Sequence, residues 1–276
     1  VHAALSELLA GLPSEPAAML VSMIIARPGA VEARLGLYWL LDPRAEIRLA
    51  AATVLLTRAE TGTLPPDLAA LLPAIRKWLP DEPARAALDA VIRWQIRDGG
   101  MQSQSSAATI HRAAASLPDG VGAQSLIAVF QQGSRRGIAM AMLKQGHGIK
   151  DAFVIPCANA SEQKRMLASI LDEIETFDIP PAALAEELAR GLGEGLALDL
   201  LPAPGFVDWA ELLGPDALTP AAGDGGAILA AIGSTDAFSP ASRAALVKAS
   251  ADWIDSGDGA SAAAFMRAWA ACTIKG

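Results

Sequence analysis

The stretch GSRRGIAMAMLKQGHGIKDAFVIPC, residues 133–157, decides the fold. Its first two residues, Gly and Ser, separate two apolar runs, and a glycine in the first place of a two-residue connection supplies the positive φ of a type II′ turn. Counting outward from this turn pairs Val129 with Ile138 and places Gln124 opposite Leu143. Both faces of the ribbon are then apolar, so we expect helices or loops to cover both faces.

A third strand is expected beside this hairpin, because a lone hairpin is marginally stable in water. The run DAFVIP, residues 151–156, is the predicted third strand. The same register places the loop at residues 118–122 beside the loop at residues 145–151, at the end of the ribbon far from the turn. That end gathers glycines, charged side chains and one histidine.

The residues at this strand end form the most specific candidate for a chemical site in the sequence. An imidazole that titrates near neutral pH and lies close to carboxylates can act as an acid, a base or a metal ligand. Charged side chains also gather at strand ends because they are solvated there, so a set of plain turn residues remains the alternative reading. The candidate catalytic residues are His147, Asp119 and Asp151, the candidate ligand-binding residues are Lys144, Lys150 and Gln124, and no metal ligands are assigned.

The pattern of residues 1–98 predicts consecutive short helices, because proline or glycine separates runs of apolar residues that have helical spacing. Residues 99–157 predict a loop, a short helix around ATIHRAAASL and an antiparallel β meander. Residues 158–276 predict a second helical region, which opens with a capping box from Asn159 to Glu162. Glycines 191, 193 and 195 lie within one of its helices and predict a close helix contact or a kink, because each costs about 1 kcal/mol relative to alanine.

One run in the first region resembles a known repeat. In the run LLDPRAEIRLAAATVLL, an aspartate and a proline precede a predicted helix, and an Ile-Arg pair within that helix is followed by small residues. This pattern is similar to that of the HEAT repeat. The matching residues are Asp42, Pro43, Ile47, Arg48 and Ala51, and a weaker echo follows at Pro80, Ala84, Arg85 and Leu88. The resemblance covers residues 14–98 and implies helix pairs that bury their apolar faces by stacking. An ordinary helical bundle is the alternative.

The predicted fold is therefore mostly α, within the α+β class. Stacked helix pairs resembling an α-solenoid carry a small antiparallel sheet between two helical lobes.

The composition of the chain argues against two classes of function, nucleic-acid binding and membrane association. The net charge of −8 and the pI near 4.9 oppose the broad positive surface that nucleic-acid binding needs. Apolar runs such as residues 19–26 fall short of the roughly 20 residues that span a membrane, so no membrane association is expected. Cys157 and Cys272 lie far apart, and the amino end shows no secretory signal, so we expect a cytoplasmic location.

We therefore expect a noncatalytic module that binds or scaffolds another protein. Stacked helices would provide an extended surface, and no nucleophile, phosphate-loop or paired metal motif occurs in the sequence. No cofactor is expected. The alternative is a small-ligand or metal-binding site, with hydrolysis as one of its reactions, at the strand end near His147.

Overall fold

The hairpin forms with the predicted register. The structure is a computed structural model that describes residues 1–97, 107–223 and 248. Strand β2 (Ala123–Gln132) pairs antiparallel with β3 (Arg135–Lys144), with Val129 opposite Ile138 and Gln124 opposite Leu143. Gly133 has a φ of 59°, as the first residue of a type II′ turn requires.

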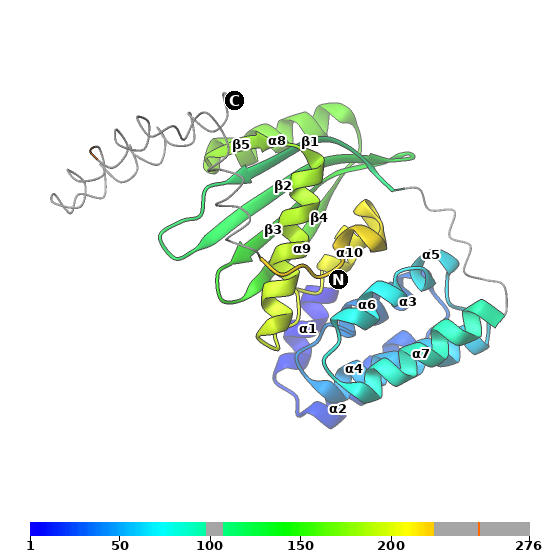
Figure 1. Ribbon diagram of the computed structural model, residues 1–276. Coiled ribbons are helices and arrows are strands. Elements are labelled where there is room, and N and C mark those ends of the chain that lie inside the picture. The colour runs from blue at the N-terminus through cyan, green and yellow to red at the C-terminus, as the bar shows by residue number, and fades with distance from the viewer. Residues whose placement is uncertain (98–106, 224–247, 249–276) are drawn as a thin grey trace. The chain divides into compact units, whose positions relative to one another are not determined.

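The predicted third strand is also confirmed, and two further strands extend the sheet. The five strands follow the order β4-β3-β2-β1-β5 and every neighbouring pair is antiparallel (Figure 1). The added elements are β1 (Thr109–Ser116), β4 (Gly148–Cys157) and β5 (Thr176–Ile179). The helix predicted around ATIHRAAASL was wrong, because strand pairing with β2 and β5 on both sides outweighs the helix propensity of this alanine-rich run.

The other regular elements of the described chain are helices. Seven precede the sheet: α1 (His2–Ala10), α2 (Ser14–Ile25), α3 (Ala30–Trp39), α4 (Ala45–Glu60), α5 (Pro66–Ala69), α6 (Leu72–Trp78) and α7 (Glu82–Arg97). The others are α8 (Ala160–Glu173), α9 (Pro181–Ala197), α10 (Phe206–Leu213) and the 3₁₀ helix η1 (Pro215–Leu218). One half of the predicted capping box forms at α8, where the Asn159 side chain accepts a hydrogen bond from the Glu162 N–H at 2.9 Å. The Glu162 carboxylate accepts from the Ala158 N–H at 2.7 Å instead of from the N–H of Asn159.

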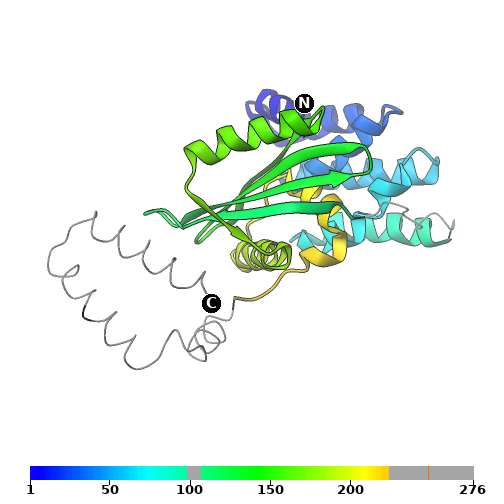
Figure 2. The same ribbon diagram turned by 90° about the horizontal axis from the view of Figure 1, so that it is seen from above.

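Helices cover both faces of the sheet, as its two apolar faces require. Figure 2 shows α8 on one face and α9 on the other. Under α8, a small core of Ala114, Ile127 and Ile138 packs against apolar side chains of the helix. The opposite face belongs to the main core, which continues into the amino-terminal helices.

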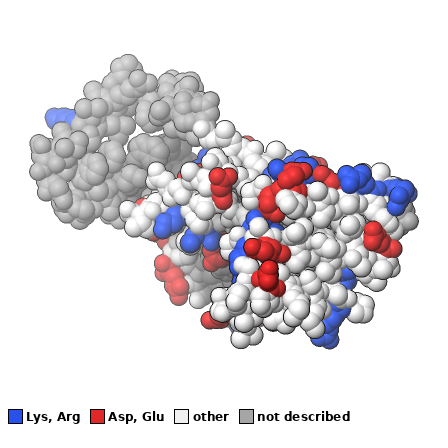
Figure 3. All heavy atoms as spheres, turned by 90° about the horizontal axis from the view of Figure 1, so that it is seen from below, with Lys and Arg blue, Asp and Glu red and all other residues white. Residues whose placement is uncertain are grey.

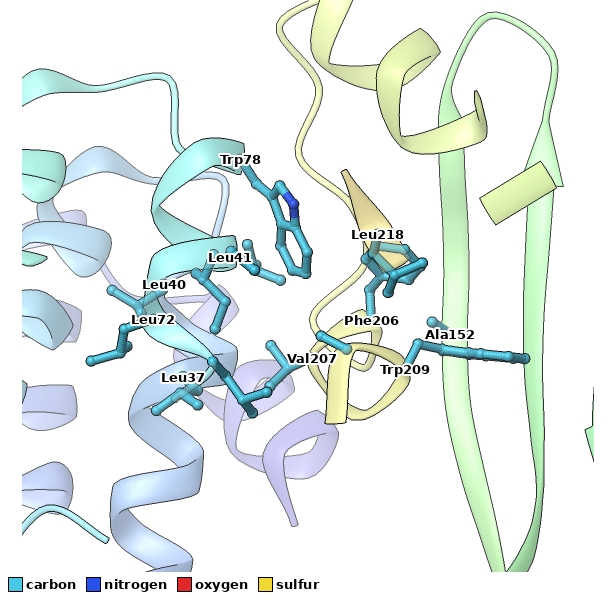
Figure 4. Close-up of a cluster of buried hydrophobic side chains, with 14 of the residues drawn as sticks. Leu37, Leu40, Leu41, Leu72, Trp78, Ala152, Phe206, Val207, Trp209 and Leu218 are labelled. Atoms are coloured by element: carbon cyan, nitrogen blue, oxygen red, sulfur yellow. The ribbon is translucent and has the colours of Figure 1, made fainter. Parts of the chain in front are cut away.

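The main core joins the amino-terminal helices to α10 and the sheet (Figure 4). The ring centroids of Trp78 and Phe206 lie 5.3 Å apart. Trp209 is fully buried and its Nε1–H donates to the Met140 carbonyl at 3.2 Å. These contacts hold the helical wall against the sheet and so position the groove described below.

The mixed helical and sheet class is confirmed, whereas an α-solenoid is not shown. Residues 1–222 form one compact unit, and the division at residues 98 and 157 stays a prediction. Residues 224–247 and 249–276 of the predicted second helical region lie outside the described residues. In the part of the chain that the structure describes, no helix combines the length and the apolar character needed to cross a bilayer.

Candidate binding groove

The two loops predicted to meet at the strand end do lie side by side. The Gln145 N–H donates to the Gly122 carbonyl at 2.9 Å, and a Cβ placed on Gly122 would lie 2.9 Å from the Gln145 Cβ. The hairpin register produces this contact, since Ala123 lies opposite Lys144.

Two of the candidate residues hold the local structure of this end. The Asp119 carboxylate accepts hydrogen bonds from the N–H groups of Val121 and Ala123, and these bonds, together with the charge of Lys144, keep its pKa below the ordinary value. The Gln124 side chain donates to the Ser116 carbonyl at 3.1 Å. Asp119 and Gln124 therefore act as turn and strand supports.

His147, Lys150 and Asp151 line cavities beside the helical wall. His147 and Lys150 line a cavity of about 340 Å³, and Asp151 lines a neighbouring one. Burial, followed by the charges of Lys150 and Lys144, lowers the pKa of His147, so the imidazole is neutral at pH 7. Within the described residues His147 forms no hydrogen bond with Asp119 or Asp151, so the structure does not join these three as an acid–base set.

Three open cavities follow one another, and together we call them the seam groove. The two larger cavities lie between the amino-terminal helices and β4, and the smallest lies between the end of α6 and the end of α9. Neighbouring cavities share lining residues, and the segment 199–205 forms one side of all three. The Trp78 section, about 160 Å³, includes Lys77, Trp78, Pro80 and Asp199. The His147 section, about 340 Å³, includes Arg48, His147, Lys150 and Asp199. The His2 section, about 650 Å³, includes His2, Tyr38, Asp42, Asp151 and Asp208.

The largest section combines apolar walls with a few ionisable groups. The His2 ring lies 5.2 Å from the Tyr38 ring and 5.6 Å from the Trp39 ring, centroid to centroid. Burial lowers the pKa of His2 to about 4, although the Asp42 carboxylate acts in the opposite direction. His2 therefore enters the groove at pH 7 as a neutral ring.

A buried charge network fixes the wall of this section. Arg34 of α3 donates to Asp208 at 2.8 Å and to Glu211 at 2.9 Å, both on α10, and Arg135 of β3 reaches Glu211 at 3.2 Å. The Tyr38 hydroxyl donates to the same oxygen of Asp208 at 2.9 Å. Burial raises the pKa of Asp208, which its hydrogen bond from Tyr38 and the charge of Arg34 only partly offset. The network ties helix, sheet and α10 together beside the groove.

We expect His2 to make the stability of the fold depend on pH. Because its folded pKa of about 4 lies below the unfolded value near 6.5, the unfolded chain binds the proton first as the pH falls. The unfolding free energy should therefore drop between pH 7 and pH 4, by about 1–2 kcal/mol after allowance for solvent at this partly exposed ring. Urea titrations of the wild type and of His2→Leu at both pH values measure the difference, and an equal pH dependence of the two proteins would contradict it.

The amino-terminal wall of the groove was missed by the sequence reasoning. His2 and Tyr38 belong to helices that carry no local motif, and only folding brings them opposite β4. The segment 199–205 did carry a signal, since its two prolines mark an extended loop. Within the described residues, no group of three His, Cys, Asp or Glu side chains is arranged to hold a metal ion.

Two comparisons of the sequence with known proteins both match proteins described as Y4lR. Residues 13–99 match the family described as Y4lR second domain. A protein of Sinorhizobium fredii (strain NBRC 101917 / NGR234), named "Uncharacterized protein y4lR", is 36% identical over 219 residues, which cover 78% of this chain and 42% of that protein. The chain thus spans less than half the length of this relative. No solved structure matches the chain.

The HEAT resemblance was wrong, because the matched family is the Y4lR second domain and no HEAT family is found. The structure explains the misleading pattern. Arg48 donates to the carbonyls of Asp42 and Pro43 and pairs with Asp81 at 2.5 Å, which links the start of α4 to the turn before α7. At the weaker echo, Arg85 instead pairs with Glu82 of its own helix, so the role of Arg48 is not repeated there.

Proposed function

We propose that the chain is a noncatalytic module that binds an extended segment of another protein in the seam groove. The observation that carries this proposal is the groove itself. Segment 199–205 lines all three of its sections, and the two larger sections lie between the helical wall and β4. Its walls are mainly apolar, with a few charged groups to fix a register, as sites for polypeptide segments commonly are.

A protein partner also fits the surface charge better than a nucleic acid does. On the face shown in Figure 3, Lys and Arg side chains are interspersed with Asp and Glu over the described part of the molecule. Nucleic-acid binding generally needs a continuous positive surface, and the net charge of −8 opposes one. The negative charge favours neutral or basic protein segments.

Selection from a displayed library of random dodecapeptides tests the proposal. We expect wild-type protein to enrich peptides with dissociation constants of about 1–100 µM, which is usual for short segments in an open groove. Ala203 lines two groove sections and is partly exposed, so Ala203→Trp should obstruct the groove and weaken these peptides at least about tenfold. Fluorescence anisotropy with labelled peptides measures the change.

The matched control is Val121→Trp, which adds the same indole to a loop residue that is 70% exposed and lies on no wall of the seam groove. Peptide binding should be unchanged in this variant. The proposal fails if no peptide is recovered, or if both tryptophan variants bind the recovered peptides equally well.

A small-ligand function is the second candidate, because His147 and Lys150 line the same 340 Å³ section together with Arg48. Thermal-shift screening with metal ions and metabolites separates it from peptide binding. A ligand-dependent shift that is present in the wild type and lost in His147→Ala would favour the small-ligand function.

A further inference from the structure

The free edge of β4 offers backbone groups that no other described strand uses. β4 is the outermost strand of the sheet and pairs only with β3. In a two-residue hairpin the closing pair, here Gln132 and Arg135, is hydrogen bonded, so alternate residues of β3 point towards β2 and the others towards β4. Following this alternation across the register directs the backbone groups of Ala152, Val154 and Pro156 away from β3.

Three local features agree with this assignment. The Ala152 N–H donates to the Asp151 carboxylate at 2.8 Å instead of to a strand. Pro156 has no N–H, and proline is tolerated at outward positions of edge strands. Nearer the start of β4, the Ile149 carbonyl accepts a hydrogen bond from the Ala203 N–H at 3.1 Å, so segment 199–205 already covers that part of the edge.

These features leave Val154 as the position at which both the N–H and the carbonyl are open. Its N–H and carbonyl point outward, and no other described segment hydrogen-bonds to them. The Ala152 carbonyl is covered, since a Cβ on Gly205 would lie 1.9 Å from its oxygen. An unpaired N–H and carbonyl on an edge strand form a template for an added strand.

The His2 section of the seam groove runs along this same edge. Four consecutive residues of β4, Asp151–Val154, line it, and the Phe153 side chain is 41% exposed. Residues whose side chains alternate between the two faces of β4 therefore border one groove, as expected where a groove follows a strand edge. The opposite wall is formed by α1 and α3, including His2 and Tyr38.

The charges of the two larger sections differ in sign. The ionisable side chains lining the His2 section are the carboxylates Asp42, Asp151 and Asp208, the Tyr38 hydroxyl and the neutral His2. The His147 section is lined by two cations, Arg48 and Lys150, and by one carboxylate, Asp199. Asp42 is paired with Arg44 and Asp208 with Arg34, whereas exposed Asp151 has no cationic partner among the described residues. A cationic side chain on a bound segment would therefore be attracted to Asp151.

We propose that the bound segment adds to the open edge of β4 as a sixth strand, pairs with the Val154 N–H and carbonyl, and places a Lys or Arg beside Asp151. This inference rests on the proposed function and specifies the mode of binding. The occupant is an extended basic and apolar segment of a protein, because main-chain pairing supplies affinity and alternate side chains supply specificity in such complexes.

Backbone N-methylation of a selected dodecapeptide tests strand addition without altering the protein. In an added strand, every second peptide N–H faces β4 and the others face away. We expect methylation at one parity to weaken binding at least about tenfold and methylation at the other parity to change it less than about twofold. The Val154 amide should also exchange with solvent more slowly in the complex, as hydrogen-exchange NMR can measure.

The charge contact has its own matched pair of variants. Asp151→Asn keeps an oxygen that can accept from the Ala152 N–H but removes the charge, and should weaken a Lys-containing peptide about three- to fivefold at low salt. Asp172→Asn removes a charge from an exposed residue of α8 and should leave binding unchanged. Equal effects of the two variants would overturn the assignment of Asp151.

The outcomes separate the two levels of the proposal. A uniform response to N-methylation, combined with continued loss of binding in Ala203→Trp, would overturn strand addition and leave the groove as the binding site. Peptide binding that is insensitive to Ala203→Trp would overturn the proposed function itself.

Discussion

Replacing Gly148 by alanine should destabilise the fold by about 3–5 kcal/mol, a large part of the stability of an ordinary domain. Gly148 begins β4 and has a φ of 84°, which costs a residue with a Cβ about 1–2 kcal/mol. A Cβ at this position would also lie 2.4 Å from the Gly191 carbonyl oxygen and 2.7 Å from the Gly195 nitrogen, both on α9. These are backbone atoms of one helix, so the clash can be relieved only by moving α9 away from the sheet.

Gly146→Ala is the control for the backbone strain. Gly146 has a similar φ of 73°, but no atom lies within 4 Å of the position of its Cβ. Its replacement should cost only about 1–2 kcal/mol, so the difference between the two variants isolates the contact with α9. Urea titration followed by circular dichroism gives both free energies of unfolding. Equal losses in the two variants would show that the close approach to α9 contributes nothing.

The role of Gly148 answers why a glycine flanks His147, and it shows how far the sequence could lead. The turn at residues 133–134 predicted the register, and counting from it placed two loops side by side because strand pairing is a local geometric rule. The glycines of α9 predicted a close contact but not its partner. That partner depends on which helix the sheet packs against, and no local pattern carries this information.

The candidate site was predicted in part for the same reason. His147, Lys150 and Asp151 line the seam groove, whereas Asp119 and Gln124 hold the turn and the strand end. Side chains at one end of a hairpin can be grouped by counting residues. The opposite wall, which includes His2 and Tyr38, comes from helices more than a hundred residues earlier, and its position depends on packing of the main core.

The strand β1 shows a third limit on what could be predicted from the sequence. Alanine-rich segments favour helices when considered alone, yet residues 109–116 lie between two strands whose backbone groups they satisfy. The segment is a strand because it pairs with a strand on each side. The helix propensity of its residues does not depend on these neighbouring strands, so it could not predict them.

Arg58→Met should destabilise the fold by about 3 kcal/mol, because it removes a buried donor from several carbonyl groups at once. Arg58 is 3% exposed. Its guanidinium donates to the carbonyls of Ile25 at 2.9 Å, Gly29 at 2.9 Å and Thr63 at 2.7 Å, and also to that of Arg27. These carbonyls belong to the end of α2, the segment leading to α3 and the segment after α4. Burial lowers the pKa of Arg58, but a guanidinium keeps its charge at neutral pH.

Two further variants separate the geometry of Arg58 from its charge. Arg58→Lys retains the positive charge but has a single ammonium in place of the planar fork, so it cannot reach all of these carbonyls and should recover only part of the stability. Arg76→Met removes an arginine that pairs with Asp89 and whose side chain is 36% exposed, and it should cost less than about 1 kcal/mol. If Arg58→Lys were as stable as the wild type, the positive charge alone would account for the contribution of Arg58 to stability. If Arg58→Met and Arg76→Met lost the same free energy of unfolding, the Arg58 guanidinium would not be what holds these three segments together.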